Sequence, residues 1–260
     1  MPHGTVSVLH LRLIFTTPRA AIALGWLLLW LSPSSGAHPF SIAERDADAY
    51  ATLAALSIPP DATVLLVEPL DNRYIKALNK TLNRHGRILV DQSGKHAGMT
   101  LSPTDLTPTP NGPRIDIDRP TSSHPRQGAD WIIIDRALHR WLATNRSEQQ
   151  LRALTQRLNP HGQLVLIDYR QDAQRPDDPK AALGYVTERL AIEKAASAGL
   201  ELAEALETNA NPHDIKDYDQ GAYTLPPVLR LGNKDRDRYM AIGEADRFTL
   251  RFHRATKSTP

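Results

Sequence analysis

The chain has 260 residues and a formal net charge of +2, from 31 Lys and Arg against 29 Asp and Glu. This near balance, without a basic block, argues against nucleic-acid binding, which depends mainly on neutralising phosphates. The chain contains no cysteine, which excludes disulfides, thiolate metal sites and a cysteine nucleophile.

The N-terminal segment has the features of a secretory signal peptide. Two arginines precede an apolar run over residues 20–31, and small residues lead up to His38. The run is shorter than the ~20 residues that a membrane-spanning helix needs. We therefore expect a signal peptide over 1–37 and an exported, periplasmic or secreted domain over 38–260. Retention of the signal as an anchor, the one expected route to a membrane, and mitochondrial-type targeting are the alternatives.

Helices and strands alternate along the first half of this domain. Apolar residues at helical spacing predict a helix from Ile42 to a stop at Pro59. The uninterrupted apolar run 64–67 predicts a strand covered on both faces. A helix over 72–85 and a strand over 87–91 follow, with Gly86 between them.

Residues 92–128 differ in composition from the segments around them. Six prolines with many Ser, Thr and Gly predict an irregular insert. Within the insert, alternating isoleucines in 114–118 predict a short strand.

Regular structure returns in the second half. Two capping boxes mark helix starts. One, Ser41 with Glu44, lies at the start of the domain, and the other, Ser147 with Gln150, lies in its second half. The other predicted elements are strands over 130–135, 163–168, 200–206 and 247–253, a turn over 159–162 and a helix over 187–198. Alternation of strands and helices predicts an α/β fold with a mostly parallel sheet and helices on both faces.

Four acidic residues lie at or near the ends of predicted strands: Glu68, Asp91, Asp135 and Asp168. In open α/β sheets, ligands bind outside the carboxyl ends of the strands. Asp91 has the spacing of an acid that accepts hydrogen bonds from ribose hydroxyls. The alternative is that these residues form turns and caps.

Four later segments follow one another in a pattern known from a large family. Residues 158–168 read LNPHGQLVLID, and residues 129–141 combine a strand with a His and Trp element. Residues 195–203 form a helix-to-strand step, and residues 246–253 form a last strand. In order and spacing they resemble the class I S-adenosylmethionine-dependent methyltransferases, and more narrowly a group of exported bacterial members.

The resemblance implies a doubly wound, seven-stranded sheet whose last strand is antiparallel. It also implies S-adenosylmethionine as cofactor and a small-molecule acceptor. His139 and Asp168 are the expected catalytic residues, which orient or deprotonate the acceptor. The residues expected to bind cofactor are Val67, Glu68, Leu70, Asn72, Asp91 and Asp135. For His139, packing on a helix face against Trp141 is the alternative.

The chain departs from the family at the turn after the first strand. The family pattern V-L-D-I-G-x-G-x-G supplies an acid and glycines, and this chain has Leu66 for the acid and Glu68 and Leu70 for glycines. Glycine there allows positive φ and close approach of the cofactor. Asp71 or Asn72 would tolerate a left-handed turn. Glu68 is a candidate substitute for the missing acid, and His161 replaces another family glycine.

Other sequence patterns give weaker evidence of a functional site. No pair of histidines has metal-ligand spacing, so no metal is expected. Residues 217–221 lack the full ligand set of a calcium loop and are expected to be a solvated loop. The mixed-charge run 172–180 is expected to be an exposed loop, with a lid as the alternative.

Two functions remain open. The first is a divergent methyltransferase that acts on an unidentified small acceptor. The second is a non-catalytic relative that keeps the sheet and binds another ligand or a protein partner. A dehydrogenase is a third, weaker hypothesis, because G-x-G-x-x-G is missing.

Overall fold

The computed structural model describes residues 42–93, 101–118 and 128–256. All of them belong to one compact unit, Ala37–Pro260. The expected signal peptide, and Ser41 of the first capping box, lie outside the described residues.

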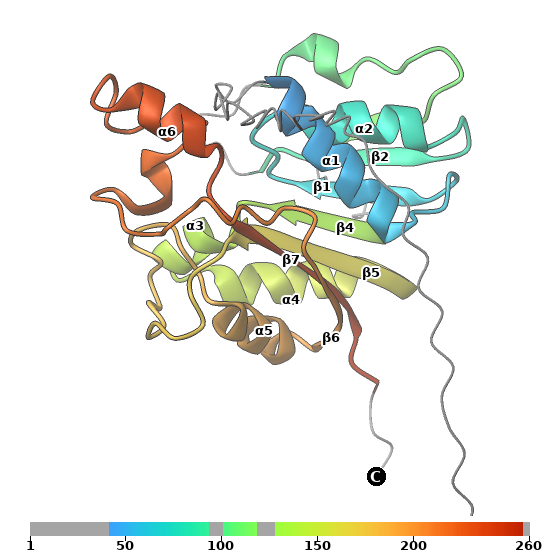
Figure 1. The fold of residues 1–260 in the computed structure, drawn as a ribbon. Helices are drawn as coiled ribbons and strands as arrows, with labels where there is room; N and C mark the ends of the chain where they lie inside the picture. The colour runs from blue at the N-terminus through green and yellow to red at the C-terminus, as the bar shows by residue number, and fades with distance from the viewer. Residues whose placement is uncertain (1–41, 94–100, 119–127, 257–260) are drawn as a thin grey trace, which may run out of the picture. The chain divides into compact units, whose positions relative to one another are not determined.

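A seven-stranded sheet forms the centre of the fold (Figure 1). The strands are β1 (Thr63–Val67), β2 (Arg87–Asp91), β3 (Arg114–Ile117), β4 (Ala129–Asp135), β5 (Leu158–Tyr169), β6 (Leu200–Leu206) and β7 (Arg247–Arg254). Their order is β3-β2-β1-β4-β5-β7-β6. The first five in this order pair in parallel, and β7 is antiparallel to both β5 and β6. The expected fold class, including the antiparallel last strand, is confirmed.

Helices cover both faces of the sheet because the central strands are apolar on both sides. In β1, Val64 and Leu66 pack in one core cluster with helices α1 (Ile42–Leu56) and α2 (Arg73–Thr81). Leu65 and Val67 pack in the other cluster, against α3, α4 and α5. These three helices are Leu138–Ala143, Ser147–Arg157 and Glu188–Ser197. Figure 1 shows α1 and α2 on one face and α3 to α5 on the other.

Two helix boundaries differ from the sequence prediction. Helix α2 ends at Thr81, short of the predicted 85, because Asn83 N–H donates to Pro60 O at 2.7 Å instead of continuing the helix. Helix α4 has Arg146 as its N-cap residue and no side-chain capping bond, so the predicted capping box of Ser147 is wrong.

The predicted turn at 159–162 is also wrong. Strand β5 runs without a break from Leu158 to Tyr169. Leu158 pairs with Ala129 at the start of β4, and a register shift before Trp131 absorbs the irregularity. The Asn-Pro-His-Gly sequence therefore forms an irregular strand start instead of a connection.

The insert between β2 and β4 contributes one strand to the sheet. Strand β3 pairs in parallel with β2 at the sheet edge, as the alternating isoleucines predicted. A short 3-10 helix, η1 (Pro103–Leu106), precedes it. No helix within the described ranges is long and apolar enough to cross a membrane.

The long connection between β6 and β7 has its own small core. It contains the 3-10 helix η2 (Gly221–Thr224) and helix α6 (Arg236–Ile242), neither of which the sequence patterns predicted. Tyr185 and Tyr239 belong to its apolar cluster, and Tyr218 packs against it. The Tyr185 hydroxyl donates to the buried carboxylate of Asp214 at 3.0 Å. This core orders residues that reach back to the carboxyl ends of β1 and β4.

Candidate functional site

The four predicted acids lie together at the carboxyl-terminal ends of strands β1, β2, β4 and β5. Glu68, Asp91, Asp135 and Asp168 are all buried, between 0 and 6 % exposed. The backbone pairing of β1 with β2 continues up to two of these acids, because Glu68 N–H donates to Asp91 O at 3.0 Å. The topology places these acids together, and their side chains have different partners.

The turn after β1 contains a residue with a left-handed backbone conformation, and that residue is not glycine. Glu68 has φ +45°, whereas Asn72 has φ −91° and is the N-cap residue of α2. Asp71 and Asn72, which would tolerate a left-handed conformation, do not adopt one. Arg136, which directly follows β4, also has positive φ, at +56°. Such conformations cost a non-glycine residue about 1–3 kcal/mol and persist only where their surroundings fix them.

The side chain of Glu68 is fixed by helix α3. Its Oε2 accepts from Arg140 Nη2 at 3.2 Å and from Trp141 Nε1 at 3.3 Å. Trp141 is fully buried in the core. Glu68 is thus held by the protein itself, in the position proposed for a cofactor-binding acid.

A buried network of ion pairs fills the space beyond β1 and β4. We call it the strand-end cluster; it consists of Asp48, Asp71, Arg73, Asp135, Arg136, Glu244 and Arg247. Arg136 lies at its centre and donates to Asp71 Oδ2 and Asp135 Oδ2, both at 3.0 Å. The cluster residues come from four segments that are far apart in the sequence.

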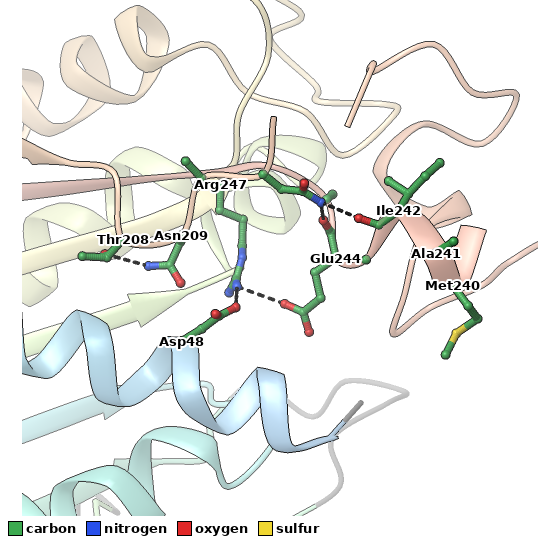
Figure 2. Close-up of a pocket in the computed structure, with 12 residues that line it drawn as sticks. Asp48, Thr208, Asn209, Met240, Ala241, Ile242, Glu244 and Arg247 are labelled. Carbon is green, nitrogen blue, oxygen red and sulfur yellow. Dashed lines mark hydrogen bonds and ion pairs between the residues drawn. The ribbon is translucent and has the colours of Figure 1, made fainter. Parts of the chain in front are cut away.

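Further cluster contacts link Glu244 and Arg247 to helices α1 and α2. Arg73 forms a two-bond pair with Glu244, at 2.8 and 3.1 Å. Arg247 Nη2 lies 3.0 Å from Glu244 Oε2 and 3.1 Å from Asp48 Oδ2 (Figure 2). The three arginine side chains are only 1–2 % exposed.

The cluster is held in its charged form. Burial disfavours the guanidinium of Arg136, yet Asp135, Asp71 and Glu244 raise its pKa well above the ordinary value. Burial would likewise raise the pKa of Glu244, and the charges of Arg247, Arg73 and Arg136 outweigh it and lower that pKa. Each charge is therefore stabilised by its neighbours, so that removing one exposes the others to an uncompensated desolvation penalty.

The other predicted cofactor residues border little free space. Val67, Leu70 and Asp135 line a cavity of about 10 Å³ together with Pro69 and Tyr74. Pockets for small ligands have volumes of roughly 300–1,000 Å³, whereas a cavity this size holds about one water. Pro69 also lacks the N–H that a ligand-binding turn would offer.

A wider groove runs beside α4. It has a volume of about 590 Å³ and is lined by Glu68, Ser93, the N-cap residue Arg146 and one side of α4, namely Gln149, Gln150, Ala153, Gln156 and Arg157. Of the predicted cofactor residues, Glu68 alone lines it. The side chain of Asp91 forms a local hydrogen bond, in which its Oδ1 accepts from Ser93 N–H at 2.8 Å. S-adenosylmethionine does not fit at the β1 turn as these residues arrange it.

The two predicted catalytic residues are in direct contact. His139 Nδ1 lies 2.6 Å from Asp168 Oδ1, and the backbone N–H of His139 donates to Asp168 Oδ2 at 3.0 Å. Burial would raise the pKa of Asp168, but the charge and hydrogen bonds of His139 lower it. The imidazole lies beside the rings of Tyr169 and Tyr223, with centroids 5.1 and 6.0 Å away. Such a pair fixes the imidazole ring and suits proton transfer at Nε2.

The sequence patterns did not predict five cluster residues: Asp48, Arg73, Arg136, Glu244 and Arg247. A usable signal was present, because an arginine follows a strand-end acid closely in Asp71-Asn-Arg73 and Asp135-Arg136. Glu244 and Arg247 gave no signal, because only the tertiary fold brings the start of β7 and the residues before it to α1, α2 and the end of β4. No three His, Asp or Glu side chains in the described ranges could hold a metal ion.

Comparison with known proteins identifies the fold. A methyltransferase described as SAM-dependent from Aquifex aeolicus is 12 % identical, with a TM-score of 0.50; 82 % of this chain and 93 % of that protein are covered. This is the Rossmann-like methyltransferase fold. A cyclopropane-fatty-acyl-phospholipid synthase-like protein from Lactobacillus casei is also 12 % identical, with a TM-score of 0.50 over 80 % of this chain and 90 % of that one.

A third solved structure, the pyocyanin biosynthetic protein PhzM, has a TM-score of 0.52 at 11 % identity. The alignment covers 80 % of this chain and 55 % of PhzM. No family model and no curated protein sequence matches the chain. At these identities the likeness establishes the methyltransferase fold, and function has to be argued from the site.

Proposed function

We propose that this chain is a methyltransferase-fold protein that does not use S-adenosylmethionine and binds a different ligand without methyl transfer. One observation carries the proposal: the strand-end cluster fills the space beyond β1 and β4. In this cluster Arg136 pairs with Asp71 and Asp135 at 3.0 Å. Asp135 is one of the residues expected to bind the cofactor, and this pairing occupies its carboxylate.

The energetic cost of opening the cluster is about half of the binding free energy of a micromolar cofactor site. Separating Arg136 from its two carboxylates breaks a buried ion pair, at about 3–5 kcal/mol. Micromolar binding corresponds to about 8.2 kcal/mol, and millimolar binding to about 4.1 kcal/mol. A micromolar site would therefore become a roughly millimolar one if the cofactor had to displace Arg136.

A divergent methyltransferase acting on a small acceptor is the second candidate. The specific observation in its favour is the contact of His139 with Asp168 at 2.6 Å. In this candidate, Asp168 orients the imidazole of His139, which then takes a proton from the acceptor. The structural neighbours with the same fold include proteins described as methyltransferases.

Calorimetric titration of the full-length chain with S-adenosylmethionine and S-adenosylhomocysteine separates the two candidates. The proposal predicts no saturable binding at micromolar ligand, where a working cofactor site would be filled. Saturable binding that Asp91→Ala weakens by about 1.5–3 kcal/mol would instead support the methyltransferase, since hydrogen bonds from ribose to a carboxylate contribute that much. Binding that Asp91→Ala leaves unchanged would also contradict the proposal and would move the cofactor away from Asp91.

We also propose that the chain is exported, on the basis of its N-terminal arginines, apolar run and small residues before His38. Export removes the domain from the cytoplasmic supply of S-adenosylmethionine, which is consistent with another ligand or a protein partner. N-terminal sequencing of the protein recovered from the producing cells tests this. A mature end at His38 supports cleavage, and an intact Met1 contradicts it.

A further inference from the structure

A pocket of about 490 Å³ lies near the amino-terminal ends of β1 and β4, at the end of these strands opposite the strand-end cluster. It is lined by the end of α1 and the loop to β1, by the first halves of β4 and β5, and by β7. Its volume falls within the range of small-molecule sites, roughly 300–1,000 Å³. Neither the strand-end cluster nor the pair of His139 and Asp168 contributes a residue to it.

We propose that this pocket binds a protonated amino sugar, with the ammonium group at Asp61 and Asp130 and ring hydroxyls at the Trp131 indole N–H and the Gln163 amide. The inference goes beyond the proposed function, because it holds whether or not S-adenosylmethionine binds at the carboxyl ends of the strands. Charge, an unused hydrogen-bond donor and the mixed polarity of the lining each support it.

Two carboxylates at the pocket have no cationic partner. Asp130 accepts from the neutral donors Thr63 N–H at 2.8 Å and Asn159 Nδ2 at 2.6 Å. Asp61 is exposed, and it forms no ion pair within the described ranges. A carboxylate accepts about four hydrogen bonds, so that both groups keep room for an ammonium donor. The pocket therefore favours a cation over an anion.

The other charges near the pocket leave this preference in place. The guanidinium of Arg251 already has an acid of its own, since its Nη2 lies 2.8 Å from Glu204 Oε2. The remaining ionisable group of the lining is the exposed imidazole of His161. Helix α1 ends at Leu56, which lines the pocket, and the C-terminal end of a helix carries a partial negative charge.

An independent observation is the indole N–H of Trp131. The side chain lines the pocket and is 8 % exposed. Its Nε1 has no hydrogen-bond acceptor within the described part of the chain, and it is not sealed from solvent. Indole is a donor only, and the N–H of a buried tryptophan usually finds an acceptor. A ligand oxygen in the pocket would supply that acceptor.

The mixed lining favours hydroxyl groups as the source of this oxygen. The amide of Gln163 makes two long hydrogen bonds of 3.5 Å, to His161 O and from Arg251 Nη1, so that it is weakly engaged. Donors and acceptors therefore alternate around the pocket, and a hydroxyl group can serve both. Leu56 and Pro59 add an apolar surface that suits the C–H groups of a sugar ring.

The test is an NMR titration of the nitrogen-labelled full-length chain with glucosamine near neutral pH, followed at the indole N–H signals. We expect a saturable shift for Trp131 and none for Trp141, whose Nε1 donates to Glu68 at 3.3 Å. Glucose, which lacks the charge, and cyclohexylamine, which lacks the hydroxyls, should each bind roughly tenfold more weakly. No shift of Trp131, or equal affinity for either of these two compounds, overturns the proposal.

Two variants with matched controls locate the site. Asp61→Asn should weaken glucosamine binding roughly tenfold, whereas Asp219→Asn, at a carboxylate that is 75 % exposed and outside the pocket, should leave it unchanged. His161→Trp places a large ring in the pocket and should abolish binding, with His213→Trp at another exposed histidine as control. Unchanged affinity in either pocket variant overturns the proposal.

A third variant tests the role of the indole N–H. Trp131→Phe keeps an aromatic ring and removes the donor, so that glucosamine binding, followed at the backbone amide of Gln163, should weaken roughly fivefold. Glucose should lose affinity by the same factor, because the indole N–H contacts a hydroxyl and not the ammonium group. Unchanged glucosamine affinity in a folded Trp131→Phe chain overturns the assignment of the hydroxyl contact.

Discussion

His139 Nδ1 lies 2.6 Å from Asp168 Oδ1, and the two residues come from the α3 helix and the end of strand β5. Asp168 is fully buried and also accepts from the backbone N–H groups of His139 and Tyr169. The pair therefore fixes how the β4 connection packs on β5, whether or not the imidazole transfers a proton.

We expect Asp168→Asn to lower the free energy of unfolding by about 1–3 kcal/mol, because the amide nitrogen faces a backbone N–H and leaves it without an acceptor. Urea denaturation at neutral pH measures this. The matched control is Asp172→Asn, at a carboxylate that is 49 % exposed, and it should change stability by less than about 0.5 kcal/mol. Equal urea midpoints for the two variants would contradict a structural role for the pair.

Arg136 holds the centre of the strand-end cluster. Arg136→Met leaves Asp71 and Asp135 buried without their common partner, and we expect a loss of about 3–5 kcal/mol in the free energy of unfolding. Arg136→Lys should recover only part of it, since one ammonium cannot reproduce the planar two-sided contact. Arg152→Met, at an exposed i,i+4 pair with Glu148, should cost no more than about 0.5 kcal/mol. A loss at Arg136 as small as that at Arg152 would show that the cluster does not stabilise the fold.

Glu244 makes the stability of the fold depend on pH. Its folded-state pKa is lowered by Arg247, Arg73 and Arg136 against the opposing effect of burial. The stabilisation is thus fully present above the ordinary value of 4.5 and is lost as pH falls toward the folded-state pKa. The difference in unfolding free energy between the wild type and Glu244→Gln should be largest near neutral pH and should shrink below pH 4.5.

The control for this pH dependence is Glu204→Gln, which removes a 44 % exposed carboxylate paired with Arg251. It should follow the wild type within about 0.5 kcal/mol at every pH, because exposed ion pairs contribute little. A constant difference between wild type and Glu244→Gln down to pH 3 would contradict the lowered pKa of Glu244.

Asp91 has a local structural task at the end of β2. Its Oδ1 accepts from Ser93 N–H at 2.8 Å and closes the turn that leaves the strand. Asp91→Ala should therefore cost about 1 kcal/mol in stability, the usual contribution of such a hydrogen bond. Thermal denaturation of both proteins measures the difference. An unchanged melting temperature, combined with loss of S-adenosylhomocysteine binding, would return Asp91 to the ribose-binding role.

The sheet was predictable from sequence because its signals are local. Runs such as Val64–Val67 and Trp131–Ile134 contain no polar residue. This composition is typical of strands that are covered by helices on both faces. The family pattern selected His139 and Asp168 separately as candidate catalytic residues, and their direct contact was not predicted. The Asn-Pro-His-Gly segment misled because its turn-forming residues occur at the irregular start of β5.

The strand-end cluster was not predictable to the same extent. Asp135 was identified as a ligand candidate, but its partners Arg136 and Arg247 decide what it does. Arg247 lies more than a hundred residues away along the chain, and only the path of the β6–β7 connection brings it there. The missing glycines indicated that the turn is altered, and the arginines show how the space is filled.

The most direct test of the central claim is a crystal structure of the full-length chain grown with millimolar S-adenosylhomocysteine. We expect that Arg136 still pairs with Asp71 and Asp135 and that no nucleoside lies at the β1 turn. Density for the nucleoside with its ribose at Asp91, and Arg136 displaced from both carboxylates, would contradict it.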